Sequence, residues 1–261
     1  MSATAIALDV RPASINYLGR IFVKEVRYEF VRMLRTRAFS LSVIGFPIMF
    51  YLLFGASNRH SEFARYLMVS YSCMGVVSAC LFGIGMGISL ERAQGWLELK
   101  LASPMPRLAY LCAKIVSSAA FAVIILFMLV ILACTVGGTR VTIFEILRIT
   151  GIVLAGSLPF AAMGLLVAVL VPANSAPGII NLIYLPMSFA SGFWMPVSFL
   201  PHWLQRIAPA LPTYHLAQIA LNVIGAAQPG NMAAHWQALA GYTLVLFGAA
   251  WIVFTRQEAQ A

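Results

Sequence analysis

The chain has 261 residues, of which 61% are hydrophobic and only 10% are charged. Soluble globular domains are usually about 45–50% apolar, so this composition excludes an ordinary soluble protein and indicates a membrane protein. The net charge of +9 could also indicate a nucleic-acid partner. The positions of the basic residues along the chain favour membrane topology as its cause instead.

The first element in chain order is a predicted amphipathic helix within residues 15–37. At about 100° per residue, its apolar and basic side chains fall on opposite faces. Such a helix lies in the membrane interface, with its basic face toward anionic headgroups. The residues that define the two faces are Phe22, Val26 and Phe30 on the apolar side and Arg20, Lys24 and Arg27 on the basic side.

Six apolar runs follow, and each is long enough to form a transmembrane helix. The runs cover residues 38–56, 66–90, 115–138, 149–171, 178–200 and 238–254. The predicted fold is therefore an all-α polytopic membrane protein, with an N-terminal segment (1–37), a transmembrane domain (38–254) and a short tail (255–261). In the second run, Gly83 and Gly87 have the four-residue spacing that lets helices approach closely.

The basic residues predict which side of the membrane each loop occupies. Of the 17 lysines and arginines, 12 lie in the N-terminal segment, in the loops on its side and in the tail, and five lie on the opposite side. By the positive-inside rule, both termini are expected in the cytoplasm, as six crossings of the inner (cytoplasmic) membrane require.

A charged, proline-terminated segment, residues 91–106, interrupts the apolar sequence on the predicted cytoplasmic side. Its pattern predicts a short amphipathic helix that ends at the prolines. Trp96 and Leu97, among charged residues such as Glu98, would suit a docking surface, which needs an apolar side chain to fill a pocket and a polar rim. Periodicity alone is equally compatible with a helix that lies on the lipid headgroups.

The residues that could carry chemistry argue against several classes of protein. The three lysines, Lys24, Lys100 and Lys114, are not followed by serine or threonine, so the sequence contains no Walker A loop. No Asp, Glu, Lys, Arg or His falls inside the six runs, which argues against an ion-coupled transporter and an intramembrane enzyme. The cysteines lack zinc-ligand spacing, and the four histidines include no i, i+4 pair. We expect no enzyme activity, cofactor or metal in this chain.

Over nearly its whole length, the chain resembles the membrane subunits of the ABC type-2 exporter permeases. Segment 91–106 is similar to the coupling motif of that family, approximately E-R-x-x-G-T-L-E-x-L followed by a proline and later a lysine. Trp96 replaces the usual threonine, and Ala113 replaces the glycine before the lysine. The matching residues are Glu91, Arg92, Gly95, Leu97, Glu98, Leu101, Pro104 and Lys114.

The resemblance implies six spans, an elbow helix before the first span and a cytoplasmic coupling helix in segment 91–106. Short re-entrant helices on the outer side, within residues 201–237, would close the exit. The outer gate would comprise Pro201, Trp203, Leu204, Pro209 and Pro212. A path lined by spans one, two and five would run between two copies of the chain. Its candidate lining residues are Tyr51, Phe54, Tyr71, Met74, Ser78, Asn181, Tyr184, Met187 and Phe193.

The function implied by the resemblance is the permease of an ATP-driven exporter that moves an amphipathic or hydrophobic substrate by alternating access. Two copies of a separate ATPase subunit would bind ATP and Mg²⁺ and dock on the coupling helix, and the permease would be a homodimer in the lipid bilayer. Nucleic acid is not an expected partner. The alternatives left open are an ion-coupled secondary transporter and a lipid- or glycan-exporting permease of the same family.

Overall fold

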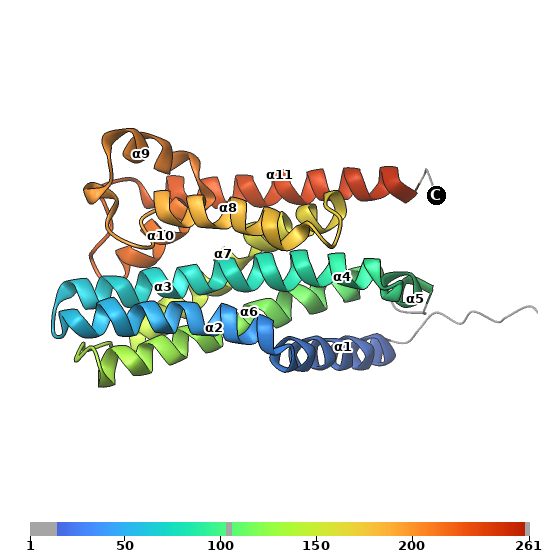
Figure 1. Cartoon of the computed structure of the whole chain (residues 1–261), viewed down its shortest axis with the longest axis horizontal. Helices are drawn as coiled ribbons and strands as arrows, with labels where there is room; N and C mark the ends of the chain where they lie inside the picture. Colours follow the sequence, from blue (N-terminus) through green and yellow to red (C-terminus); the bar gives the residue numbers. More distant parts are fainter. Residues whose placement is uncertain (1–14, 103–105, 259–261) are drawn as a thin grey trace, which may run out of the picture.

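The structure is a computed structural model that describes residues 15–102 and 106–258, whereas residues 1–14, 103–105 and 259–261 lie outside the described part. Within the described part, the chain consists of helices and their connections, without a strand. The long helices lie side by side along the long axis of the molecule (Figure 1). The prediction of an all-α protein is confirmed.

The bundle has two distinct ends. One end, called the charged end here, contains α1, α5, the start of α6 and the end of α11, and the opposite end contains α9 and α10 (Figure 1). In chain order, the helices are α1 (Ile15–Arg35), α2 (Arg37–Phe50) with the short segments η1 (Tyr51–Gly55) and η2 (Ala56–Asn58), α3 (Glu62–Cys80), η3 (Leu81–Met86), α4 (Gly87–Ala93), α5 (Trp96–Ala102), α6 (Arg107–Thr135), α7 (Ile143–Leu170), α8 (Ala176–Ala190), η4 (Val197–Phe199), α9 (His202–Ile207), η5 (Ala208–Ala210), α10 (Pro212–Asn222) and α11 (Met232–Glu258).

Five of the six predicted spans form helices that are long and apolar enough to cross a membrane. Within the described residues they are Arg37–Asn58, Glu62–Ala93, Leu108–Thr135, Ile143–Leu170 and Met232–Val253. The second of these runs continuously through α3, the π-helical segment η3 and α4. The fifth predicted run, 178–200, differs, because its helix α8 has only 15 residues and a helix needs about 20 to cross the hydrocarbon.

Glycine and proline explain why α8 is short. Its last residue is Ala190, and two residues later Gly192 has a φ of +87°, a conformation that a β-carbon disfavours. The chain turns there, Tyr66 donates a hydrogen bond to the Gly192 carbonyl (2.5 Å), and Pro196 then precedes the short segment η4. The apolar composition of this stretch predicts a continuous spanning helix, which the structure does not form.

The start of α7 is fixed by a capping box. The Thr142 hydroxyl accepts a hydrogen bond from the Glu145 backbone N–H (3.3 Å), and the Glu145 carboxylate accepts one from the Thr142 N–H (2.8 Å). These bonds satisfy N–H groups that have no partner inside the helix. The helix therefore begins at Ile143 rather than at 149, and Arg148 lies within α7 instead of in a loop.

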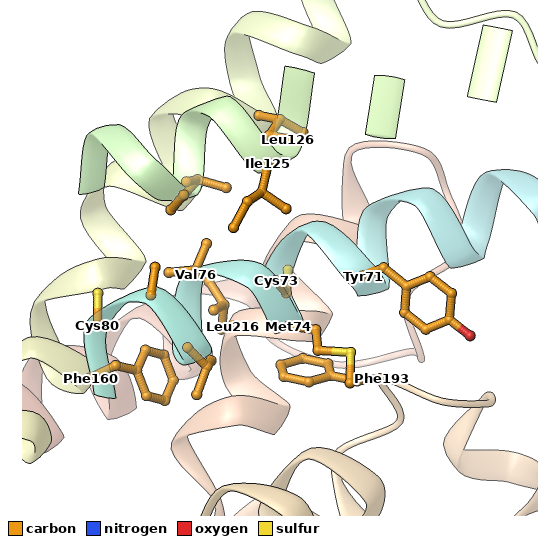
Figure 2. Close-up of a cluster of buried hydrophobic side chains, with 14 of the residues drawn as sticks. Tyr71, Cys73, Met74, Val76, Cys80, Ile125, Leu126, Phe160, Phe193 and Leu216 are labelled. Atoms are coloured by element: carbon orange, nitrogen blue, oxygen red, sulfur yellow. The ribbon is translucent and has the colours of Figure 1, made fainter. Parts of the chain in front are cut away.

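Helix α3 occupies the centre of the bundle and packs against α6, α7 and α10. Figure 2 shows Val76 and Cys73 of α3 facing Ile125 and Leu126 of α6. Phe160 of α7 and Leu216 of α10 complete this buried cluster from the other side. The remaining helices are arranged around this core.

Glycines bring the second span against three neighbours. A β-carbon at Gly83 would lie 2.9 Å from both the Met33 side chain and the Ser118 hydroxyl, and one at Gly87 would lie 3.0 Å from the Arg32 guanidinium. The close helix contact predicted from Gly83 and Gly87 is thus confirmed, with α1 and α6 as the neighbours. Gly85 packs in turn on Gly164 of α7.

Candidate functional site

The charged end contains a buried cluster of opposite charges that joins three helices. Lys114 of α6 donates hydrogen bonds to Glu29 of α1 (2.9 Å) and to Glu91 of α4 (3.1 Å). The side chains of Lys114 and Glu29 are only 2% and 1% exposed. Charges so deeply buried are stable only when they are paired.

Neighbouring side chains complete the cluster. The Arg32 guanidinium lies 2.5 Å from Glu29 and 3.0 Å from Glu91, and the Tyr110 hydroxyl donates to the second oxygen of Glu91 (2.5 Å). Lys100 of α5 lies 2.7 Å from Glu25 and 3.7 Å from Glu91. We call these seven residues the charged cluster: Glu25, Glu29, Arg32, Glu91, Lys100, Tyr110 and Lys114.

Cations and carboxylates balance in the charged cluster, with three of each. Burial by itself would lower the pKa of Arg32, but the nearby Glu29 and Glu91 carboxylates outweigh it and raise that pKa above its ordinary value. The guanidinium therefore stays charged at any physiological pH. The cluster ties α1, α4, α5 and α6 together at one end of the membrane-spanning helices.

The first half of segment 91–106 is fixed to the bundle. Glu91 is buried in the charged cluster, and Arg92 donates to the carbonyls of Val169 (3.0 Å) and Val171 (2.7 Å), at the end of α7. Leu97 packs, partly buried, on an apolar patch that includes Tyr110. These side chains therefore contact the chain's own helices.

The second half of the segment turns outward. Gly95 has a φ of +73°, so the chain changes direction between α4 and α5. On α5, Trp96 is 53% exposed and Leu99, three residues later on the same face, is 70% exposed. The side chains of Glu98 and Leu101, and all of Pro104, lie outside the described part.

The amphipathic helix predicted within residues 15–37 is present as α1. Arg20, Lys24 and Arg27 are exposed, whereas Phe22, Val26 and Phe30 are partly buried. Its apolar side packs on α6, where the rings of Phe30 and Phe121 lie 5.8 Å apart and the Ser117 hydroxyl donates to the Val26 carbonyl (3.1 Å).

Sequence reasoning missed Glu29, the most buried carboxylate of the charged cluster. One signal was available: at 100° per residue Glu29 falls on the apolar face of α1, beside Phe22. A carboxylate at such a position needs a buried cation as its partner. Lys114, identified only through the coupling motif, is that cation.

A cavity of about 410 Å³ lies between α2, the second span and α8. Of the predicted path residues, Ser78, Asn181 and Tyr184 line it. The other lining residues are Thr36, Ala38, Phe39, Ser42, Val43, Phe46, Pro47, Phe82, Met86 and Leu185. Its wall is thus apolar and aromatic, with a few hydroxyl groups and one amide.

The remaining predicted path residues do not reach this cavity. Phe54, at the far end of the first span, is 47% exposed. The others are packed in the core, and these are Tyr51, Tyr71, Met74, Met187 and Phe193. Figure 2 shows Met74 in contact with the ring of Phe193.

The predicted gate residues lie at the opposite end in short helices. Trp203 of α9 is 61% exposed, whereas Leu204 packs on a small cluster that contains Val197, Leu200 and Tyr214. Pro201 directly precedes α9, Pro209 lies within η5, and Pro212 is the first residue of α10. Proline is favoured there because the first N–H groups of a helix have no internal acceptor.

Two histidines at this end contact each other. The Nδ1 atoms of His215 in α10 and His235 in α11 lie 2.8 Å apart, so one ring donates to the other. Burial lowers the pKa of His215, and the adjacent His235 ring lowers it further. In the described residues no group of three or more His, Cys, Asp or Glu side chains is arranged to hold a metal ion.

Five apolar helices of spanning length, packed around a buried core, define a multi-pass membrane protein. Residues 22–224 match the sequence model of the ABC-2 type transporter family, and the chain belongs to that family. It is 27% identical over 215 residues to the Bacillus subtilis (strain 168) protein named "Putative transport permease YvfS", an alignment that covers 80% of this chain and 87% of the relative.

Proposed function

We propose that this chain is the permease subunit of an ATP-driven exporter and that α5 docks on a separate ATPase subunit. The observation that carries the proposal is the exposed apolar pair Trp96 and Leu99, displayed on a short helix whose base is fixed to the bundle. An exposed aromatic side chain with charged neighbours fits a pocket on a protein partner. Because the chain lacks a Walker A loop, ATP and Mg²⁺ would be bound in that partner.

The contacts at the base of α5 would transmit movement of the ATPase to the spans. Lys100 links α5 to α1, Glu91 links α4 to α6, and Arg92 links α4 to α7. A displacement of α5 would therefore move several spans together rather than bend a loop. Alternating access requires that movement of the ATPase favours one of two arrangements of the packed helices over the other.

The exposed apolar faces of α2 and α8 support a homodimer, in which each permease would dock one ATPase subunit. Leu41 and Leu53 of the first span and Leu182 of α8 are 76%, 55% and 73% exposed. A second copy placed on these faces would cover the cavity and enclose it between two permeases. The excess of basic residues supports an orientation in the inner membrane with the charged end and both termini in the cytoplasm.

The cavity suits an amphipathic or hydrophobic cargo. Phe39, Phe46 and Phe82 offer apolar contacts, and Asn181 and Ser78 offer a few hydrogen bonds. Export of a lipid or a lipid-linked glycan is compatible with the same wall. Ion-coupled transport is less well supported, because the buried charges are paired at one end of the helices instead of at mid-span.

Docking can be tested with Trp96→Ala/Leu99→Ala, a variant that shortens only exposed side chains. The tagged permease is purified in mild detergent from its own host, and the copurifying proteins are identified by mass spectrometry. A subunit whose sequence contains a Walker A loop is expected with the wild type and should fall about tenfold or more with the variant, since a central aromatic contact contributes about 2 kcal/mol or more.

The matched control is Trp203→Ala, because Trp203 is similarly exposed at the opposite end. It should retain the ATPase subunit and the folded yield of the wild type. Failure of any ATPase to copurify with the wild type, or equal retention by the docking variant, would remove the basis for the proposal.

The cavity can be tested with Asn181→Trp, which fills the space between α2 and α8. The probe is a photoactivatable adamantyl diazirine, a small apolar reagent, and the measurement is labelling of the α3 and α8 peptides in detergent. We expect a severalfold decrease in Asn181→Trp and no decrease in Leu182→Trp, whose side chain is exposed and outside the lining. Equal labelling of both variants would show that the probe does not enter the cavity.

A further inference from the structure

A second cleft, of about 300 Å³, lies at the opposite end of the bundle. Three helices that are distant in sequence, α7, α10 and α11, meet there. The lining residues are Arg148, Gly151 and Ile152 of α7, Ile219 and Asn222 of α10, Val223 just after α10, and Met232 and Trp236 of α11.

Arg148 is the only charged residue of this lining. It lies one and a half turns inside α7, five residues after the start at Ile143. In the described part of the chain, no carboxylate oxygen lies within 4.0 Å of it. Glu145, the acidic residue nearest in sequence, is engaged by Arg65 of α3 and by its own helix cap.

The rest of the cleft is suited to a molecule with an apolar part. Ile152, Ile219 and Val223 form an apolar floor, and the Trp236 ring is 41% exposed at the rim. Tryptophan is common at the level of lipid headgroups, where the indole N–H can contact water while the rest of the ring contacts apolar chains. The Asn222 amide adds hydrogen-bonding capacity at the rim.

Two of the helices that line the cleft carry further exposed apolar side chains along their length. Leu154 and Leu158 of α7 are 47% and 41% exposed, and Leu244 of α11 is 75% exposed. A cation at the end of a membrane-spanning helix, next to an exposed apolar surface, matches the phosphate and the acyl chain of a phospholipid. An arginine guanidinium also binds phosphate oxygens in a bidentate manner.

We propose that this cleft binds an anionic phospholipid, with its phosphate at Arg148 and an acyl chain along α7 and α11. The lining contains no Asp or Glu that could hold the ammonium group of a zwitterionic lipid, so the charge of the cleft favours a net negative headgroup. The inference needs only that the chain spans a membrane, and it is independent of the ATPase and of the cargo.

The test uses the full chain, delipidated in mild detergent, and measures bound phosphatidylglycerol and phosphatidylcholine by native mass spectrometry. The variants are Arg148→Gln, Gly151→Trp, which fills the cleft without removing the charge, and the control Arg140→Gln, an exposed arginine outside the cleft. The Gly151 backbone has room for a side chain, because nothing lies within 4 Å of its β-carbon position.

The wild type and Arg140→Gln should retain phosphatidylglycerol in preference to phosphatidylcholine. Arg148→Gln should weaken phosphatidylglycerol binding about tenfold, as expected for the loss of one charge-assisted hydrogen bond, and Gly151→Trp should weaken both lipids. Excess glycerol phosphate should not displace the lipid. The proposal is wrong if Arg148→Gln binds like the wild type, if Arg140→Gln has the same defect, or if glycerol phosphate competes fully, because the site would then bind a soluble phosphate.

Discussion

Replacing Lys114 with methionine should destabilise the folded protein by about 3–5 kcal/mol, the range for breaking a buried ion pair by removing one partner. Lys114 is within hydrogen-bonding distance of both Glu29 and Glu91, which are themselves buried. Methionine fills similar space but leaves the two carboxylates with one cation fewer. The measurement is the free energy of unfolding in mixed micelles, followed by tryptophan fluorescence.

The control for this variant is Lys24→Met, which removes an exposed lysine from α1 and should change the unfolding free energy by less than about 0.5 kcal/mol. The double variant Glu29→Gln/Lys114→Met restores the charge balance of the cluster. It should therefore be more stable than Lys114→Met alone, because neighbouring groups in one network are not additive. Equal stability of Lys114→Met and the wild type would mean that the cluster does not hold α1, α4 and α6 together.

Gly164→Ala should also destabilise the protein, by roughly 1–3 kcal/mol, as overpacking of a tight interior does. A β-carbon at Gly164 would lie 2.9 Å from the Cys80 carbonyl oxygen and 3.3 Å from the Gly85 nitrogen. Both are backbone atoms, so relief requires separation of α7 from the second span. The measurement is again the free energy of unfolding in mixed micelles.

The direction of the change in unfolding free energy makes Gly164→Ala informative. In an unobstructed helix, alanine is more favourable than glycine by about 0.8–1.0 kcal/mol. Gly241→Ala in α11 provides that case, because nothing lies within 4 Å of its β-carbon position, and it should be neutral or slightly stabilising. If both variants behave alike, the close approach at Gly164 is not a determinant of stability.

The sequence predicts the spans well, because the thickness of the hydrocarbon layer requires long apolar helices whatever the details of packing. The sequence predicts the first and last residues of the helices less accurately. The pattern of Thr142 and Glu145 is a capping box that could have moved the start of α7 to Ile143. The end of α8 depends on the turn at Gly192, which the apolar composition of that stretch hides.

The candidate site could be predicted only in part, and the reason is physical. Periodicity identifies an amphipathic helix and a charged segment, but it does not show which charges meet in space. The sequence predicts that Glu91 lies at the surface of segment 91–106, yet its carboxylate is buried against Lys114, Arg32 and Tyr110. Exposure of Trp96 and burial of Glu91, only five residues apart, follow from the turn at Gly95.

The charged cluster also has a consequence for the order in which the protein is made. Glu29 and Glu91 emerge from the ribosome before Lys114, and synthesis proceeds from the N-terminus. Until α6 is made, the two carboxylates have Arg32 as a shared cation but lack Lys114, which contacts both of them. We therefore expect α1 to dock fully on the bundle only late in biogenesis, once the ammonium group of Lys114 is in place.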